Sequence, residues 1–160
     1  MNKTAYAFRF QPEKCIQCHA CTVACKIWNN TEHGVNLRHF YARFEGKFPK
    51  PQLVPVSVSC LHCNDPACAA ICPTGAIAQG KDGVVRVDRS LCVGCRACLD
   101  ACPVDAPQFG ADGLMRKCEL CGGEAACASA CPTQALTLEQ LQPEEKAKLD
   151  QRFLNWKKVF

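Results

Sequence analysis

Sixteen cysteines are the residues of this 160-residue chain whose type and spacing could do chemistry, and they occur in four groups of four. In the run CVGCRACLDACP, residues 92–103, they recur at steps of three, three and four. Thiols this close together cannot all share the narrow geometry of one disulfide, whereas they can all reach one small metal centre. The groups are Cys15, Cys18, Cys21 and Cys25; Cys60, Cys63, Cys68 and Cys72; Cys92, Cys95, Cys98 and Cys102; and Cys118, Cys121, Cys127 and Cys131.

The spacing CxxCxxCxxxCP is typical of bacterial ferredoxins, in which cysteine thiolates hold cubane iron–sulfur clusters. At four thiolates for each cluster, the sixteen cysteines predict four [4Fe-4S] clusters and leave no thiol over. The sequence offers no open metal position and no other catalytic arrangement of side chains. The chain is therefore not expected to be an enzyme by itself.

Two other uses of clustered cysteines fit the sequence less well. Disulfide-stapled secreted domains are made with a signal peptide, and the start MNKTAYAFRF has no apolar core, twin arginine or cleavage site. Structural zinc sites usually take two CxxC-like pairs separated by a longer loop, which groups one and three lack. The start of the chain also predicts a cytoplasmic location, although a protein of this kind can be exported alongside a partner that carries the signal.

An internal repeat indicates how the four groups pair. Residues 85–95 align without gaps on residues 8–18, each as a short alternating strand that leads into a cysteine loop. Residues 126–138 match residues 67–79 in the same way. Groups two and three therefore form one unit, joined by a hairpin that turns at residues 80–83. Groups one and four form a second unit, which the first unit interrupts.

The predicted fold class is α+β. It consists of two bacterial-ferredoxin-like units, each a ββ hairpin with short helices, one inserted in the other, followed by a C-terminal amphipathic helix. The expected divisions are an outer two-cluster unit at residues 1–25 and 104–138, an extended cover at 26–59, an inner two-cluster unit at 60–103, and a docking helix at 139–160.

The pairing of the groups also predicts which cysteines share a cluster. In two-cluster ferredoxins the fourth cysteine of each group ligates the other cluster. Applied to both units, this crossover gives four ligand sets. Set 1 is Cys15, Cys18, Cys21 and Cys131; set 2 is Cys118, Cys121, Cys127 and Cys25; set 3 is Cys60, Cys63, Cys68 and Cys102; and set 4 is Cys92, Cys95, Cys98 and Cys72.

The formal net charge of +4 at pH 7 does not indicate a nucleic-acid-binding protein. An oxidised cubane with four thiolates carries about −2, so four clusters reverse the sign of the total. No stretch approaches the roughly 18–20 apolar residues of a membrane span. Neither a nucleic-acid partner nor a direct membrane span is expected.

The order of the groups, the ACK ending of the first, the long excursion before the second and the middle DGVVRVDRSLCVGCRAC resemble a known family. It comprises the four-cluster electron-transfer subunits of molybdenum and tungsten pterin enzymes, such as dimethyl sulfoxide reductases and formate dehydrogenases. The resemblance covers roughly residues 6–138. In size the chain is most similar to the polyferredoxin subunit of bacterial tungsten aldehyde oxidoreductases, because group four has only five residues between its second and third cysteines.

This resemblance implies a non-catalytic subunit of an anaerobic oxidoreductase complex, which relays single electrons through its clusters. One partner would be a catalytic subunit of the tungsten or molybdenum pterin type. The other would be a flavin- or NAD-type subunit or another electron carrier. A freestanding polyferredoxin shuttle is the alternative, and a zinc-based structural or nucleic-acid module is a third class that iron content would separate from both.

Two segments lie outside the cysteine groups. Residues 26–59 carry several aromatic residues and prolines, which predict an extended cover over the clusters or a partner surface. The tail at residues 143–160 predicts a helix that begins at Pro143. Its apolar stripe either packs on this chain or docks a partner subunit or a second copy, and it comprises Leu149, Phe153, Trp156 and Phe160. The four histidines are expected at the surface or in packing, not as ligands.

Overall fold

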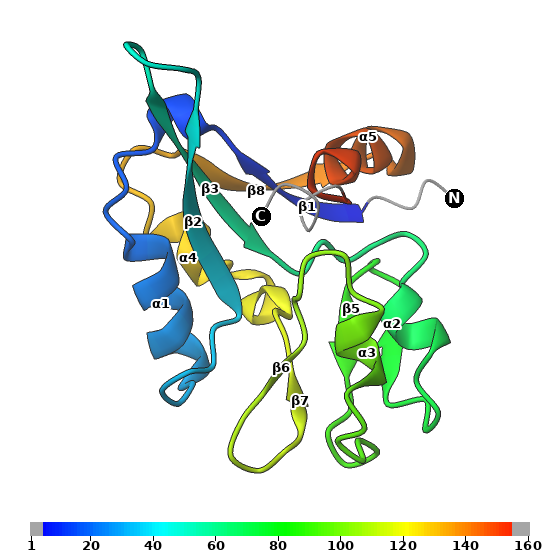
Figure 1. Ribbon diagram of the computed structural model, residues 1–160. Coiled ribbons are helices and arrows are strands. Elements are labelled where there is room, and N and C mark those ends of the chain that lie inside the picture. The colour runs from blue at the N-terminus through cyan, green and yellow to red at the C-terminus, as the bar shows by residue number, and fades with distance from the viewer. Residues whose placement is uncertain (1–4, 155–160) are drawn as a thin grey trace.

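The computed structural model describes residues 5–154 of the chain (Figure 1). Within these residues the fold is α+β, as the sequence predicts, with four two-stranded antiparallel sheets and short helices. No helix in this range has both the length and the apolar composition that crossing a membrane would require.

The strands are β1 (Ala5–Phe10), β2 (Arg38–Glu45), β3 (Gln52–Ser59), β4 (Ile77–Gln79), β5 (Val85–Val87), β6 (Gln108–Phe109), β7 (Met115–Arg116) and β8 (Leu136–Leu141). The helices are α1 (Ala20–Asn29), α2 (Ala67–Ala70), α3 (Ala97–Asp100), α4 (Ala126–Ser129) and α5 (Pro143–Leu154), with 3₁₀ turns η1 (Pro12–Lys14) and η2 (Leu120–Gly123).

The strands pair in the nested order that the repeat predicts. β1 pairs with β8, so that Ala5 lies opposite Leu141 and strands from distant parts of the chain form one sheet. β4 pairs with β5 inside that span. The helices follow the same order, because α1 contacts α4 and α2 contacts α3. In Figure 1 these two helix pairs lie on opposite sides of the molecule.

The turn between β4 and β5 contains Gly80 and Gly83, as the sequence predicts. The Gly80 N–H donates to the Val84 carbonyl oxygen at 2.9 Å. Asp82 accepts from the Val84 N–H at 3.1 Å and from the Arg86 guanidinium at 2.9 and 2.6 Å. The Arg86 guanidinium thereby lowers the pKa of Asp82 to about 2. An ion pair therefore reinforces the turn.

We expect Asp82→Asn to loosen this turn and leave the rest of the fold intact. Both side chains of the ion pair are more than a third exposed, so its loss should cost only about 0.2–1 kcal/mol. Hydrogen exchange at neutral pH should then show the Val84 amide exchanging up to about fivefold faster. Asp88→Asn, which alters a carboxylate bonded to Ser90, is the matched control. Equal acceleration in both variants would contradict the prediction.

The segment at residues 26–59 contains a long hairpin as well as the end of α1. β2 and β3 pair over eight residues, from Arg38 opposite Ser59 to Glu45 opposite Gln52. The base of the hairpin is buried in the protein, whereas its tip projects from the rest of the molecule (Figure 1). Only the base of this hairpin can therefore serve as the predicted cover over the clusters, because its tip projects into solvent.

The base of the hairpin contributes to a central core that also contains cysteines of both units. Cys60 of the inner unit and Cys118 of the outer unit belong to this one buried cluster. Their apolar neighbours are Val58, Val84, Val104, Ala106 and Leu120. The two units therefore share one core at their junction, and they are not separate globules.

The helix α5 begins at Pro143, as predicted, after β8 has continued through residues 139–141. Its apolar stripe packs on its own chain: Leu149 is buried, and Phe153 lies against the central core. Of the two alternatives for the stripe, the positions of Leu149 and of the partly buried Phe153 favour packing on this chain over docking of a partner or a second copy. Trp156 and Phe160 lie outside the described residues.

Candidate iron–sulfur sites

The four cysteine groups are positioned by similar local structure. The first two cysteines of each group lie in a loop or 3₁₀ turn, and the third lies on a helix. The third cysteines are Cys21 on α1, Cys68 on α2, Cys98 on α3 and Cys127 on α4. In group one α1 is longer, so Cys25 lies on it as well, one turn after Cys21.

Left-handed backbone conformations let the loops turn between cysteines. Gln17 and Gly94 occupy equivalent positions of the repeat and have φ angles of 56° and 68°, and His19 and Arg96, also equivalent, have 59° and 65°. At Gly94 a Cβ would lie 2.7 Å from the carbonyl oxygen of Gly113, so only glycine fits there. The sequence repeat is thus also a repeat of backbone path.

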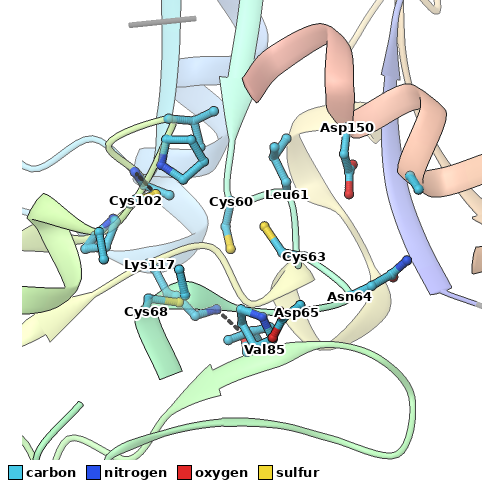
Figure 2. Close-up of a pocket in the computed structure, with 18 of the residues that line it drawn as sticks. Cys60, Leu61, Cys63, Asn64, Asp65, Cys68, Val85, Cys102, Lys117 and Asp150 are labelled. Carbon is cyan, nitrogen blue, oxygen red and sulfur yellow. Dashed lines mark hydrogen bonds between the residues drawn. The ribbon is translucent and has the colours of Figure 1, made fainter. Parts of the chain in front are cut away.

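Set 3 surrounds a cavity of about 420 Å³ (Figure 2). All four of its cysteines line this space, and Cys102 reaches it from the group that follows in the sequence. Cys72, the fourth cysteine of the same group as Cys60, does not line it. The four thiols that the sequence assigns to set 3 therefore lie around one space, as a crossover would require.

Set 4 lines a second, smaller cavity. Cys72 lies there with the three cysteines of the following group. The rest of the lining includes Phe109 and Met115. Burial raises the pKa of the Cys98 thiol to about 11, and the nearby Cys68 thiol of set 3 contributes to this shift. Sets 3 and 4 are therefore neighbours.

In the outer unit too, the fourth cysteines of groups one and four lie near cysteines of the other group. Burial raises the pKa of Cys15, and the thiols that raise it further include Cys131 from group four. Burial also raises the pKa of Cys25, to about 12, with further contributions from Cys118, Cys127 and Cys121. The Asn29 amide nitrogen lies 3.7 Å from the sulfur of Cys25 and 3.9 Å from that of Cys121. Cys25 therefore lies among the thiols of group four.

Backbone amides donate to several of these sulfurs, as expected around iron–sulfur clusters, whose potentials depend on such bonds. The bonds run from Gln17 N–H to Cys15 at 3.4 Å, His62 N–H to Cys60 at 3.5 Å, Ala106 N–H to Cys102 at 3.3 Å and Met115 N–H to Cys92 at 3.5 Å. The hydroxyl groups of Thr74 and Thr133 lie 3.6 and 3.8 Å from the sulfurs of Cys72 and Cys131. The two threonine contacts recur at equivalent positions of the two units.

The donor sets suit a polynuclear group better than a single ion. Across residues 5–154, no three His, Cys, Asp or Glu side chains converge closely enough to hold one metal ion. The four thiols of set 3 instead surround a volume between them. Four cysteine thiolates are the ligands of a cubane cluster, so the residues present fit [4Fe-4S].

His62 does not serve as a further ligand in these donor sets. This side chain is buried, and its Nδ1 accepts from the Val85 N–H at 3.1 Å. Burial, together with the charge of nearby Lys117, lowers the pKa of His62 to about 3. His62 is therefore a neutral packing residue, consistent with the sequence expectation.

Arg38 was not predicted as part of any site, although its side chain is buried near the cysteines of set 2. No local pattern distinguishes it from a solvent-exposed strand arginine. Its burial depends on long-range packing, which one sequence does not reveal.

Comparison with known proteins identifies the class to which this architecture belongs. The sequence matches the 4Fe-4S dicluster domain family over residues 52–141 and again over residues 14–77. The first match alone covers more than half of the sequence, so this protein belongs to the family. Together the matches include all sixteen cysteines, the number required for four [4Fe-4S] clusters.

Within that class the chain is similar to subunits of several oxidoreductases. It is 40% identical to the B polypeptide of the anaerobic dimethyl sulfoxide reductase of Haemophilus influenzae, over 72% of this chain and 62% of that protein. It is 41% identical to the formate dehydrogenase iron-sulfur subunit of Wolinella succinogenes, over 68% of this chain and 56% of that protein. The chain thus spans about three fifths of the length of such relatives.

Proposed function

We propose that this chain is a non-catalytic electron-transfer subunit, which relays single electrons through four [4Fe-4S] clusters for a molybdenum or tungsten pterin oxidoreductase. The observation that carries the proposal is the gathering of sixteen cysteines into four sets within two nested ferredoxin units. The similarity to the B polypeptide of a dimethyl sulfoxide reductase and to the iron-sulfur subunit of a formate dehydrogenase supports the kind of partner.

We further propose that sets 1 to 4 are the ligand sets of the clusters. Bound there, each cluster would supply a centre that accepts and returns one electron. The protein holds the thiolates, donates hydrogen bonds to their sulfurs and keeps water from the buried ones. The packing around set 3 supports this role, because the cavity is bordered by apolar side chains such as Leu61 and Val104.

The sets follow one another through the protein in a continuous line. Cys21 and Cys131 of set 1 pack against the buried cluster that contains Cys25 and Cys127 of set 2. Sets 2 and 3 meet at the central core through Cys118 and Cys60, and sets 3 and 4 adjoin as described above. This order supports a route from set 1 at one end to set 4 at the other.

The finer identity of the partner rests on the short loop of group four. This feature favours a complex of the tungsten aldehyde oxidoreductase type, in which a flavin- or NAD-type subunit or another carrier exchanges electrons at the far end. The proposed compartment is the cytoplasm. A freestanding polyferredoxin shuttle is the second candidate, because all four proposed ligand sets are complete within this chain.

Elemental analysis of the complex recovered anaerobically from the native cell, through a tag on this chain, tests the proposal. We expect about 16 iron atoms per chain, four for each cubane, with tungsten or molybdenum in proportion. Iron without either metal would favour the free shuttle. Zinc without iron would contradict the proposal, and an untagged culture taken through the same purification provides the background.

A further inference from the structure

Three lysine or arginine side chains are buried among the described residues, and two of them have no acidic partner there. Lys146 pairs with Asp150 in α5. Arg38 and Lys117, which are 2% and 4% exposed, form no ion pair with any carboxylate in residues 5–154. A buried cation without a compensating negative charge is strongly destabilising. The compensating charge must therefore come from a group other than a carboxylate of this region.

Arg38 begins β2 at the buried base of the hairpin. Its guanidinium donates to the hydroxyl oxygens of Ser57 at 3.1 Å and Ser59 at 2.9 Å, and it lies 4.2 Å from the centre of the Phe8 ring. These neighbours are neutral, so they orient the charge without neutralising it. Phe8 packs against both the buried cluster that contains Cys118 and the one that contains Cys127, so the charge of Arg38 lies beside thiols of set 2. In keeping with this position, burial raises the pKa values of Cys118 and Cys127, and Arg38 opposes this effect in both.

Lys117 directly precedes Cys118 of set 2 in the sequence and is buried. Its Nζ donates to the carbonyl oxygens of Val85 and Cys118, the latter at 2.9 Å. Lys117 also lines the cavity that set 3 surrounds, as Figure 2 shows. Burial raises the pKa of the set 3 thiol Cys60, and Lys117 opposes that effect most strongly. Lys117 therefore lies between sets 2 and 3.

We propose that Arg38 and Lys117 raise the reduction potentials of the clusters held by sets 2 and 3. This inference rests on the proposed function, since it requires clusters at those sets. Reduction adds one negative charge to a cluster, and a fixed positive charge in the poorly polarisable core stabilises the reduced state more than the oxidised state. The negative charge of the clusters would in turn neutralise Arg38 and Lys117. This explains why both side chains are buried without a carboxylate partner in the described residues.

Redox titration of the cluster-loaded full-length protein, followed by electron paramagnetic resonance, tests this role. Lys117→Met and Arg38→Gln should each lower the equilibrium constant for reduction of the affected cluster, on the order of tenfold, which is about 59 mV for one electron. Lys117→Arg and Arg38→Lys retain the charge and should restore values close to the original. Arg43→Gln is the matched control, because Arg43 is partly exposed and pairs with Glu45.

Iron content separates the possible failures. If the unaltered protein binds no clusters, the proposed function fails before the role of these charges is tested. If iron-replete Lys117→Met and Arg38→Gln titrate like the unaltered protein, the tuning role is wrong. Loss of iron in Lys117→Met but not in Lys117→Arg would support a requirement for the charge. Equal loss in both would overturn it, because side-chain shape would then be the cause.

Discussion

Replacing Cys63 and Cys102 together with alanine should lower the iron content from about 16 to about 12 atoms per chain, no further than either replacement alone. Both thiols line the same cavity, so the second replacement damages a cluster that is already lost. Replacing Cys95 and Cys102 together should instead leave about 8 atoms, because Cys95 lines the other cavity. The measurement is iron and acid-labile sulfide per chain after anaerobic purification.

These paired variants distinguish crossover from sequential ligation. If the four cysteines of each sequence group shared one cluster, the two results would be exchanged, and Cys63 with Cys102 would remove two clusters. The outer unit provides an independent replicate. Cys18 with Cys131 should remove one cluster and Cys121 with Cys131 should remove two, since Cys131 lies near Cys15 and its neighbours. Agreement between the two units would exclude an effect peculiar to one variant.

Leu149→Ala should release α5 and expose the set 3 site. Leu149 is buried, and such a truncation typically costs about 2–5 kcal/mol. Amides of α5 should therefore exchange at least about tenfold faster with solvent. Ala147 and Asp150 of the same helix line the cavity around Cys60, so air should bleach the visible cluster absorbance faster as well.

Lys148→Ala is the matched control, because Lys148 neighbours Leu149 but is exposed. Equal bleaching in both variants would show that α5 does not shield the site. If the apolar stripe served only to dock a partner, deletion of residues 143–160 would leave the iron content intact. We expect the deletion to lower the iron content instead, because it removes part of the lining of the cavity.

The features that the sequence predicts well are those that depend on local spacing. Cysteines three residues apart must converge wherever they occur, and glycines at 80 and 83 bound the turn between β4 and β5. The nested pairing of β1 with β8 is a long-range feature, yet it was predictable because the inner unit repeats the pattern in one continuous segment. The repeat supplied the long-range information that a single segment lacks.

The features that were not predicted depend on tertiary packing alone. The hairpin of β2 and β3 has no counterpart in the repeat, and its strand β3 contains Pro55, a residue that usually argues against a strand. Arg38 resembles any exposed strand arginine until the hairpin carries it into the core. Leu149 lies on an amphipathic stripe that predicts an apolar contact, although the stripe does not say which surface provides that contact.

The pairing of β1 with β8 has a consequence for the order in which the protein is made. All the cysteines that line the two inner cavities lie within residues 60–102, so these thiols are synthesised early, but the cavity of set 3 is complete only when Ala147 and Asp150 of α5 have followed. The outer unit must wait for β8, which is separated from β1 by more than a hundred residues. Maturation should therefore be completed late in both units, because β8 closes the outer sheet and α5 then closes the cavity of set 3.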